Sequence, residues 1–187
     1  MFIHRYNTNR YRKGVLKNIM GENDKRIQAN NDEINLYCFL GEALLKIQML
    51  EQALSHSITL KMNPDETKEK ADEFLKKQQH YTLGQSIRIA LEKKLFNSAL
   101  QNELNSFLEK RNWMVHSVII GNEEDFNAGK ITEELFNKIK SISDKAEDIK
   151  RDIEYDMIDF CSSKGKDMSK IKELLLIQEK GIRVLKS

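Results

Sequence analysis

The chain of 187 residues contains a single proline, Pro64, and only eight glycines. A sandwich or barrel of many strands needs such residues in a turn about every ten positions. So few turn residues exclude these folds. Apolar residues make up 40% of the chain and charged residues 32%, enough of both to fill a core and to cover a surface. We therefore predict an all-α fold.

Apolar residues at helical spacing mark two long segments. One helix is expected to begin at the capping residue Asn31 and to end before Pro64, and another to follow Thr132 and to end at Lys164 and Gly165. Each stripe is wide enough to serve both a core and a dimer interface. The first stripe comprises Leu36, Leu40, Ala43, Ile47, Leu50, Leu54 and Ile58, and the second Leu135, Ile139, Ile142, Ala146, Ile149, Ile153 and Met157.

Shorter helices are expected between and after these two. Residues 65–79 predict a mostly charged, looser helix, and residues 82–85 have the Thr-x-x-Gln form of a capping box. Apolar spacing then continues to a stop at Gly121, through one helix or two, and a last helix runs from Asp167 through Leu185. Because such stripes need one another for burial, we predict an antiparallel bundle of four or five helices.

The first 26 residues differ from the rest in charge. They hold seven Lys and Arg against two acidic residues, a net charge of +5, which leaves −3 for the remainder. We expect residues 1–30 to form a basic N-terminal arm and residues 31–187 one helical domain. The arm can bind RNA phosphates, although its charge alone is explained more simply by a solvated terminus. Its candidate RNA-binding residues are Arg5, Arg10, Arg12, Lys13 and Lys17.

Several classes of protein lack their sequence signals here. Cys38 and Cys161 lie inside apolar helical patterns, and two thiols with no short spacing offer neither a disulfide framework nor a zinc knuckle. We predict a cytoplasmic protein with no membrane span. No phosphate-binding glycine loop and no nucleophile elbow is present. The four histidines are scattered, so we expect no metal and no cofactor.

One group of polar side chains stands out late in the segment that follows Asn97. Asn112 and His116 are four residues apart and share one helical face, and Arg111 can reach the same point. Arg111 also stands where the apolar stripe through Leu108 next calls for an apolar residue. A fixed charge at such a position is costly unless it has a partner or a function.

The hexapeptide from Arg111 to His116 resembles the Arg-Asn-x-x-x-His signature of the HEPN superfamily. These are small all-α domains, and many are metal-independent RNA endonucleases of toxin–antitoxin and antiviral defence systems. All polar positions of the signature match, and its place late in a long helix also fits. An Arg-to-His spacing with Asn directly after Arg is expected by chance only about 0.01 times in this chain. Architectural resemblance covers about residues 31–165.

The resemblance implies an endoribonuclease whose catalytic residues are Arg111, Asn112 and His116. RNA carries its own nucleophile, the 2′-hydroxyl, so the enzyme has only to move protons and to stabilise charge on the phosphate. His116 would act as general base or acid, Arg111 would hold the non-bridging phosphate oxygens, and Asn112 would orient one of them. HEPN ribonucleases typically form homodimers with both motifs in one cleft, which would supply the second histidine. The expected partners are RNA, a second copy and an antitoxin or regulatory protein.

Two other interpretations stay open. In the first, the chain is a non-catalytic helical dimerisation or interaction module of a defence system. Arg111 then pairs with a carboxylate across the bundle, Asn112 bonds a loop, and His116 is a satisfied core histidine near a helix end. In the second, the basic arm binds duplex DNA with a steep salt dependence and no cleavage.

Overall fold

The computed structural model describes residues 29–65, 67–78, 80–123, 125 and 130–181. The chain divides into two units, Met1–Asn31 and Asp32–Ser187. Residues 1–28 of the basic arm, which include its five candidate RNA-binding cations, lie outside the described residues. Within the described ranges all regular structure is helical, which confirms the predicted all-α class. None of the helices in these ranges has both the length and the apolar composition that crossing a bilayer requires.

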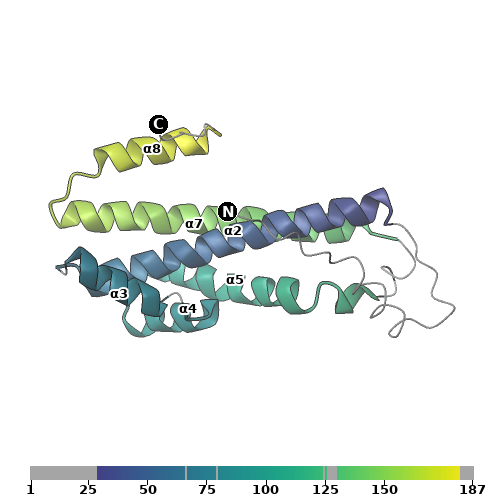
Figure 1. The fold of residues 1–187 in the computed structure, drawn as a ribbon, viewed down its shortest axis with the longest axis horizontal. Helices are drawn as coiled ribbons and strands as arrows, with labels where there is room; N and C mark the ends of the chain where they lie inside the picture. The colour runs from purple at the N-terminus through teal and green to yellow at the C-terminus, as the bar shows by residue number, and fades with distance from the viewer. Residues whose placement is uncertain (1–28, 66, 79, 124, 126–129, 182–187) are drawn as a thin grey trace, which may run out of the picture. The chain divides into compact units, whose positions relative to one another are not determined.

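Six α-helices and one 3-10 helix make up the regular structure of the described ranges (Figure 1). Both long helices begin and end where their caps predicted, and the charged helix α3 buries no residue. Of the two predicted stripes, only Leu40 and Met157 fall short of full burial. The helices are α2 (Asn31–Met62), α3 (Lys68–Gln78), α4 (Leu83–Glu92), α5 (Ser98–His116), the 3-10 helix η1 (Ile120–Asn122), α7 (Glu133–Ser163) and α8 (Ser169–Glu179).

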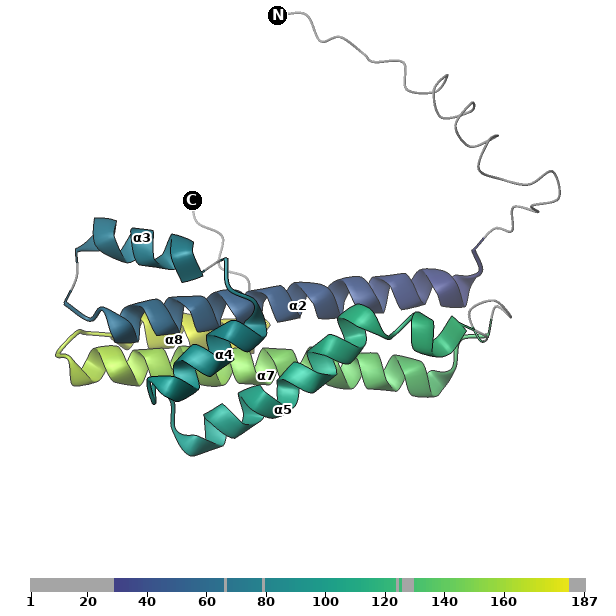
Figure 2. The ribbon, with the colours of Figure 1, turned by 90° about the horizontal axis from the view of Figure 1, so that it is seen from below.

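The long helices α2 and α7 lie side by side and run in the same direction (Figures 1 and 2). Near their starts, the rings of Phe39 and Phe136 meet edge to face with centroids 5.4 Å apart. Toward their ends, Lys61 of α2 pairs with Asp156 of α7. The two helices therefore lie start beside start and end beside end. A third helix packs against this parallel pair.

Helix α5 is that third helix, and it packs antiparallel to α7. Glu103 early in α5 pairs with Lys145 at 3.1 Å, whereas Trp113 near its end lies under Lys138, whose ammonium is 3.5 Å from the ring centre. The apolar core lies between α2, α4, α5 and α7, with Phe107 of α5 almost fully buried. The end of α5 is therefore held against two other helices.

Two helices rather than one lie between the capping box and the end of α5. The capping box is confirmed, because the Thr82 amide donates to Gln85 Oε1 at 2.8 Å and the Gln85 amide donates to Thr82 Oγ1 at 3.3 Å. Helix α4 stops shortly before Lys94, whose φ of 53° is left-handed. The side chain of Asn97 then caps α5 by accepting from the Leu100 amide at 2.9 Å.

A buried lysine fixes the point at which α5 begins. The side chain of Lys61 is only 7% exposed, and it pairs with Asp156. Its ammonium also donates to the Leu95 carbonyl oxygen at 2.7 Å and lies 4.6 Å from the centre of the Phe96 ring. A buried charge needs such partners. The connection from α4 to α5 is thus tied to both long helices.

Helix α5 ends earlier than the sequence indicated. It stops at His116, and a turn and η1 follow, whereas the apolar spacing predicted a helix that continues to Gly121. The amide of Ser117 still bonds to the Trp113 carbonyl oxygen at 2.8 Å and closes the last turn. Val115 lies at an apolar position of the expected stripe yet is exposed, whereas its neighbours Met114 and Val118 are buried, so Val115 faces away from the core.

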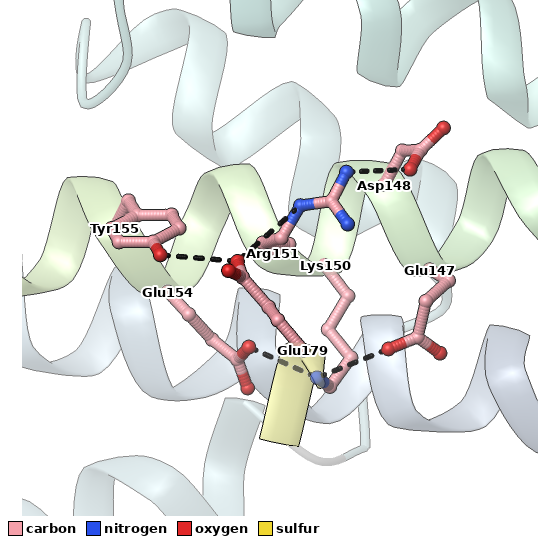
Figure 3. A network of polar contacts seen from close by, with 7 residues as sticks. All are labelled: Glu147, Asp148, Lys150, Arg151, Glu154, Tyr155 and Glu179. Carbon is pink, nitrogen blue, oxygen red and sulfur yellow. Dashed lines mark hydrogen bonds and ion pairs between the residues drawn. The ribbon is translucent and has the colours of Figure 1, made fainter. Parts of the chain in front are cut away.

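Helix α8 folds back on α7 and is held there largely by polar contacts (Figure 3). The Tyr155 hydroxyl donates to Glu179 Oε1 at 3.0 Å, and Arg151 Nε lies 3.8 Å from the same oxygen. Burial first, and then the bond to Glu179, raise the pKa of Tyr155 above its ordinary value. Leu175 is the one residue of α8 that is buried. This helix ends at Glu179, short of the expected Leu185, which lies outside the described residues.

Candidate functional site

The three motif residues all lie on the last two turns of α5. The structure places Asn112 and His116 one turn apart, and both side chains are exposed. Arg111 is half-buried on an adjoining face of the same helix. No hydrogen bond joins the three side chains, and neither Asn112 nor His116 bonds another described side chain. The expectation that His116 could be a satisfied core histidine is therefore wrong.

A carboxylate on α2 holds the Arg111 guanidinium. Arg111 Nε and Nη2 both donate to Glu51 Oε1, at 3.3 and 3.2 Å. The side chains are 23% and 31% exposed, so the pair lies at the edge of the core rather than inside it. Both bonds end on the same oxygen of Glu51. Its other oxygen, Oε2, and Arg111 Nη1 form no hydrogen bond with a described residue. The contact orients the guanidinium and leaves part of it open to a ligand.

Glu51 was not predicted as a site residue, although the sequence carries a signal for it. In the apolar stretch of α2, Glu42 and Lys46 are four residues apart and pair with each other at 3.0 Å. Glu51 has no basic residue three or four positions away on either side. A half-buried carboxylate without a local partner needs one from another helix. Arg111 is a matching cation, because it stands at a position of its helix where the spacing calls for an apolar residue.

Trp113 is a packing residue rather than a base-stacking one. Its ring packs against the apolar core, and the Lys138 ammonium lies on its face at 3.5 Å from the ring centre. A nucleobase cannot stack on a face that is already covered in this way. Any stacking surface of the site has to come from another aromatic residue.

Exposed apolar side chains lie close to the motif in the chain and along the helix that contacts it. Val115, Ile119 and Ile120 flank His116. On α2, exposed apolar side chains also lie on the sides of the helix that face away from its buried stripe, and we call these residues the outer face of α2. This outer face comprises Ile34, Tyr37, Leu44, Leu45 and Met49.

The stripe on α7 does not offer a comparable surface. None of the exposed large apolar side chains lies on α7, all of whose residues are described. The sequence indicated that both long stripes could serve a core and a dimer interface at once. On α7 the large apolar side chains are buried or half-buried, whereas α2 carries further apolar side chains that are exposed.

No group of three or more His, Cys, Asp or Glu side chains converges within the described ranges in a way that could hold a metal ion.

Comparison with protein-family models, with curated proteins and with solved structures found no match for this chain. The function therefore has to be inferred from the side chains themselves.

Proposed function

We propose that the chain is a metal-independent endoribonuclease of the HEPN type, acting in a toxin–antitoxin or antiviral defence system. The catalytic residues are Arg111, Asn112 and His116. The observation that carries the proposal is their arrangement: His116 and Asn112 are exposed one turn apart, beside an arginine whose guanidinium Glu51 already orients. We also propose that the fold is a bundle of four to five helices, with α2, α4, α5 and α7 around the core. Helix α5 is antiparallel to α7, whereas α2 and α7 are parallel, so the expected all-antiparallel arrangement does not hold for the two long helices.

The reaction uses the nucleophile that RNA itself carries. His116 takes the proton from the 2′-hydroxyl, and this oxygen attacks the adjacent phosphorus while the bond from phosphorus to the 5′-oxygen breaks. Arg111 binds the non-bridging oxygens, where negative charge grows in the transition state. Asn112 orients His116 or the phosphate. The products carry a 2′,3′-cyclic phosphate and a 5′-hydroxyl group.

Glu51 acts in this scheme as a positioning residue. An arginine side chain has many rotamers, and fixing it before the substrate binds lowers the entropic cost of the reaction. The bonds from Nε and Nη2 to Glu51 fix the plane of the Arg111 guanidinium. Nη1 remains for a phosphate oxygen.

A second copy of the chain completes the site. One histidine cannot readily act as base at the 2′-oxygen and as acid at the 5′-oxygen, because these atoms lie on opposite sides of the phosphorus in an in-line displacement. Two protomers that pair through the outer face of α2 would bring in a second His116, which gives its proton to the leaving 5′-oxygen. The bond between Glu51 and Arg111 ties the motif to α2, the helix that would carry this interface.

Leu45→Lys is expected to convert the dimer into a monomer and to abolish cleavage. Leu45 is 57% exposed on the outer face of α2, so lysine there costs the monomer little but introduces like charges across a symmetric interface. Leu91→Lys on α4 is the matched control, because Leu91 is 54% exposed and lies off this face. Sedimentation velocity at micromolar concentration measures the state. A wild-type monomer, or an active Leu45→Lys monomer, would contradict the composite site.

The basic arm is proposed to contact RNA phosphates on either side of the site. Its cations attract RNA of any sequence, which suits an enzyme whose sequence specificity comes from other residues.

The rival function is a non-catalytic interaction module. The ion pair between Arg111 and Glu51 favours it, because the pair also braces α5 against α2. Incubation of single-stranded RNA with the purified protein in EDTA separates the two functions.

A further inference from the structure

Glu51 lines a cavity of about 400 Å³ in addition to holding Arg111. The cavity is formed by Gln48, Gln52 and Ser55 of α2 and by Tyr81, which stands between α3 and α4. Its volume is in the range of small-ligand sites. Because one carboxylate belongs to both, the cavity adjoins the proposed catalytic site.

The walls of this cavity are polar but contain no cation. Gln48 and Gln52 are exposed, and neither carboxamide bonds another described residue, so each can donate and accept. The Ser55 hydroxyl donates to the Glu51 carbonyl oxygen at 2.9 Å, which leaves its lone pairs as acceptors. Glu51 Oε2 is a further acceptor. A phosphate group would find only a carboxylate and neutral groups here.

An exposed aromatic ring completes the lining. Tyr81 is 42% exposed, and its side chain contacts no other ring or cation among the described residues. A ring in this state can stack on a planar ligand, which Trp113 cannot do under Lys138. A neutral planar ligand with donors and acceptors on its edge suits this combination. In RNA, that ligand is a nucleobase.

We propose that this cavity binds the base of a nucleotide adjoining the scissile phosphate, and that it selects bases with an exocyclic amino group over uracil. The inference rests on the proposed ribonuclease function. The amino groups of adenine, cytosine and guanine donate to Glu51 Oε2 or to a glutamine carbonyl. Uracil places a carbonyl oxygen where adenine and cytosine carry the amino group, and this oxygen faces the carboxylate unfavourably. Tyr81 stacks on whichever base enters.

Binding of 2′-O-methyl RNA nonamers tests this proposal without any cleavage, because the nucleophile is blocked. Dissociation constants of A9, C9 and U9 are measured by fluorescence anisotropy on the full chain at one salt concentration. Phosphate contacts, including those of the arm, are the same for all three and cancel in the comparison. Wild type is expected to bind A9 and C9 about tenfold or more tighter than U9.

Three variants locate the effect. Tyr81→Ala is expected to weaken A9 and C9 binding about tenfold through lost stacking, whereas Tyr81→Phe, which keeps the ring, binds as wild type does. Gln52→Ala is expected to reduce the preference over U9, and Gln178→Ala, an exposed glutamine on α8, leaves it unchanged.

Equal binding of the three nonamers, or a Tyr81→Ala variant that binds all of them as wild type does, overturns the cavity proposal. It leaves the ribonuclease proposal standing, since that depends on cleavage of unmodified RNA. Base-dependent binding by a protein that never cleaves RNA has the opposite meaning: the cavity binds bases, and the ribonuclease proposal is wrong. Failure of every nonamer to bind overturns the cavity proposal, and cleavage of unmodified RNA then decides the ribonuclease proposal separately.

Discussion

His116→Ala is expected to lower the rate of RNA cleavage by about 10²- to 10⁴-fold while RNA affinity stays within about twofold of wild type. Removing a proton-transfer group raises the barrier far more than it disturbs the bound ground state. His116 is exposed at the end of α5 and bonds no other described side chain, so its loss leaves no cavity and no unpaired partner. Single-turnover cleavage gives the rate, and fluorescence anisotropy gives the affinity.

The matched control for this variant is His56→Ala. His56 is also exposed, but it stands on α2 outside the motif. The His56→Ala variant is expected to cleave RNA at the wild-type rate. Circular dichroism and sedimentation establish that each variant remains folded and keeps its oligomeric state. If His116→Ala unfolds or dissociates, the residue is structural first and the enzymatic proposal loses its main support.

Arg111→Lys is expected to lower the cleavage rate by about 10²- to 10³-fold, again with RNA binding largely kept. Lysine retains the charge but not the planar fork, so it cannot bond Glu51 and a phosphate oxygen in fixed directions at once. Folding should change little, because the ion pair with Glu51 is partly exposed and an ammonium can still form it. Arg88→Lys, an exposed arginine on α4, is the control.

Glu51→Gln separates the positioning role from simple bracing. A glutamine keeps a carbonyl acceptor for Arg111 but lacks the charge, so cleavage should fall by less than in Arg111→Lys. Bracing alone predicts that both variants lower the melting temperature together and leave the cleavage rate per folded molecule unchanged. That result would assign Arg111 to the interface between α5 and α2 and would favour the non-catalytic interaction module.

Helices α2 and α7 could be predicted from the sequence because their signals are local. The cap at Thr132, the position of Pro64 and the spacing of apolar residues act within a few turns and need no partner. The connection between α4 and α5 also involves Lys61, more than thirty positions from the carbonyl group of Leu95 that it bonds. Periodicity contains no information about such long-range contacts.

The residues of the candidate site could be proposed from the sequence, but their contacts with other helices could not. Arg111, Asn112 and His116 were found from one motif, whereas Glu51 is 60 positions from Arg111. The same limit applies to Val115, because the apolar spacing did not show that Val115 faces solvent while Met114 beside it faces the core. The cavity at Tyr81 follows from the connection between α3 and α4, for which the sequence carried little information.

Cleavage of single-stranded RNA by the wild-type protein in EDTA, with analysis of the product ends, tests the central proposal most directly. A dimeric HEPN-type ribonuclease predicts products with 2′,3′-cyclic phosphate and 5′-hydroxyl ends, formed at an undiminished rate when divalent cations are chelated. Intact RNA across substrates of mixed sequence, or products with 3′-hydroxyl and 5′-phosphate ends that appear only with added divalent cations, would contradict it.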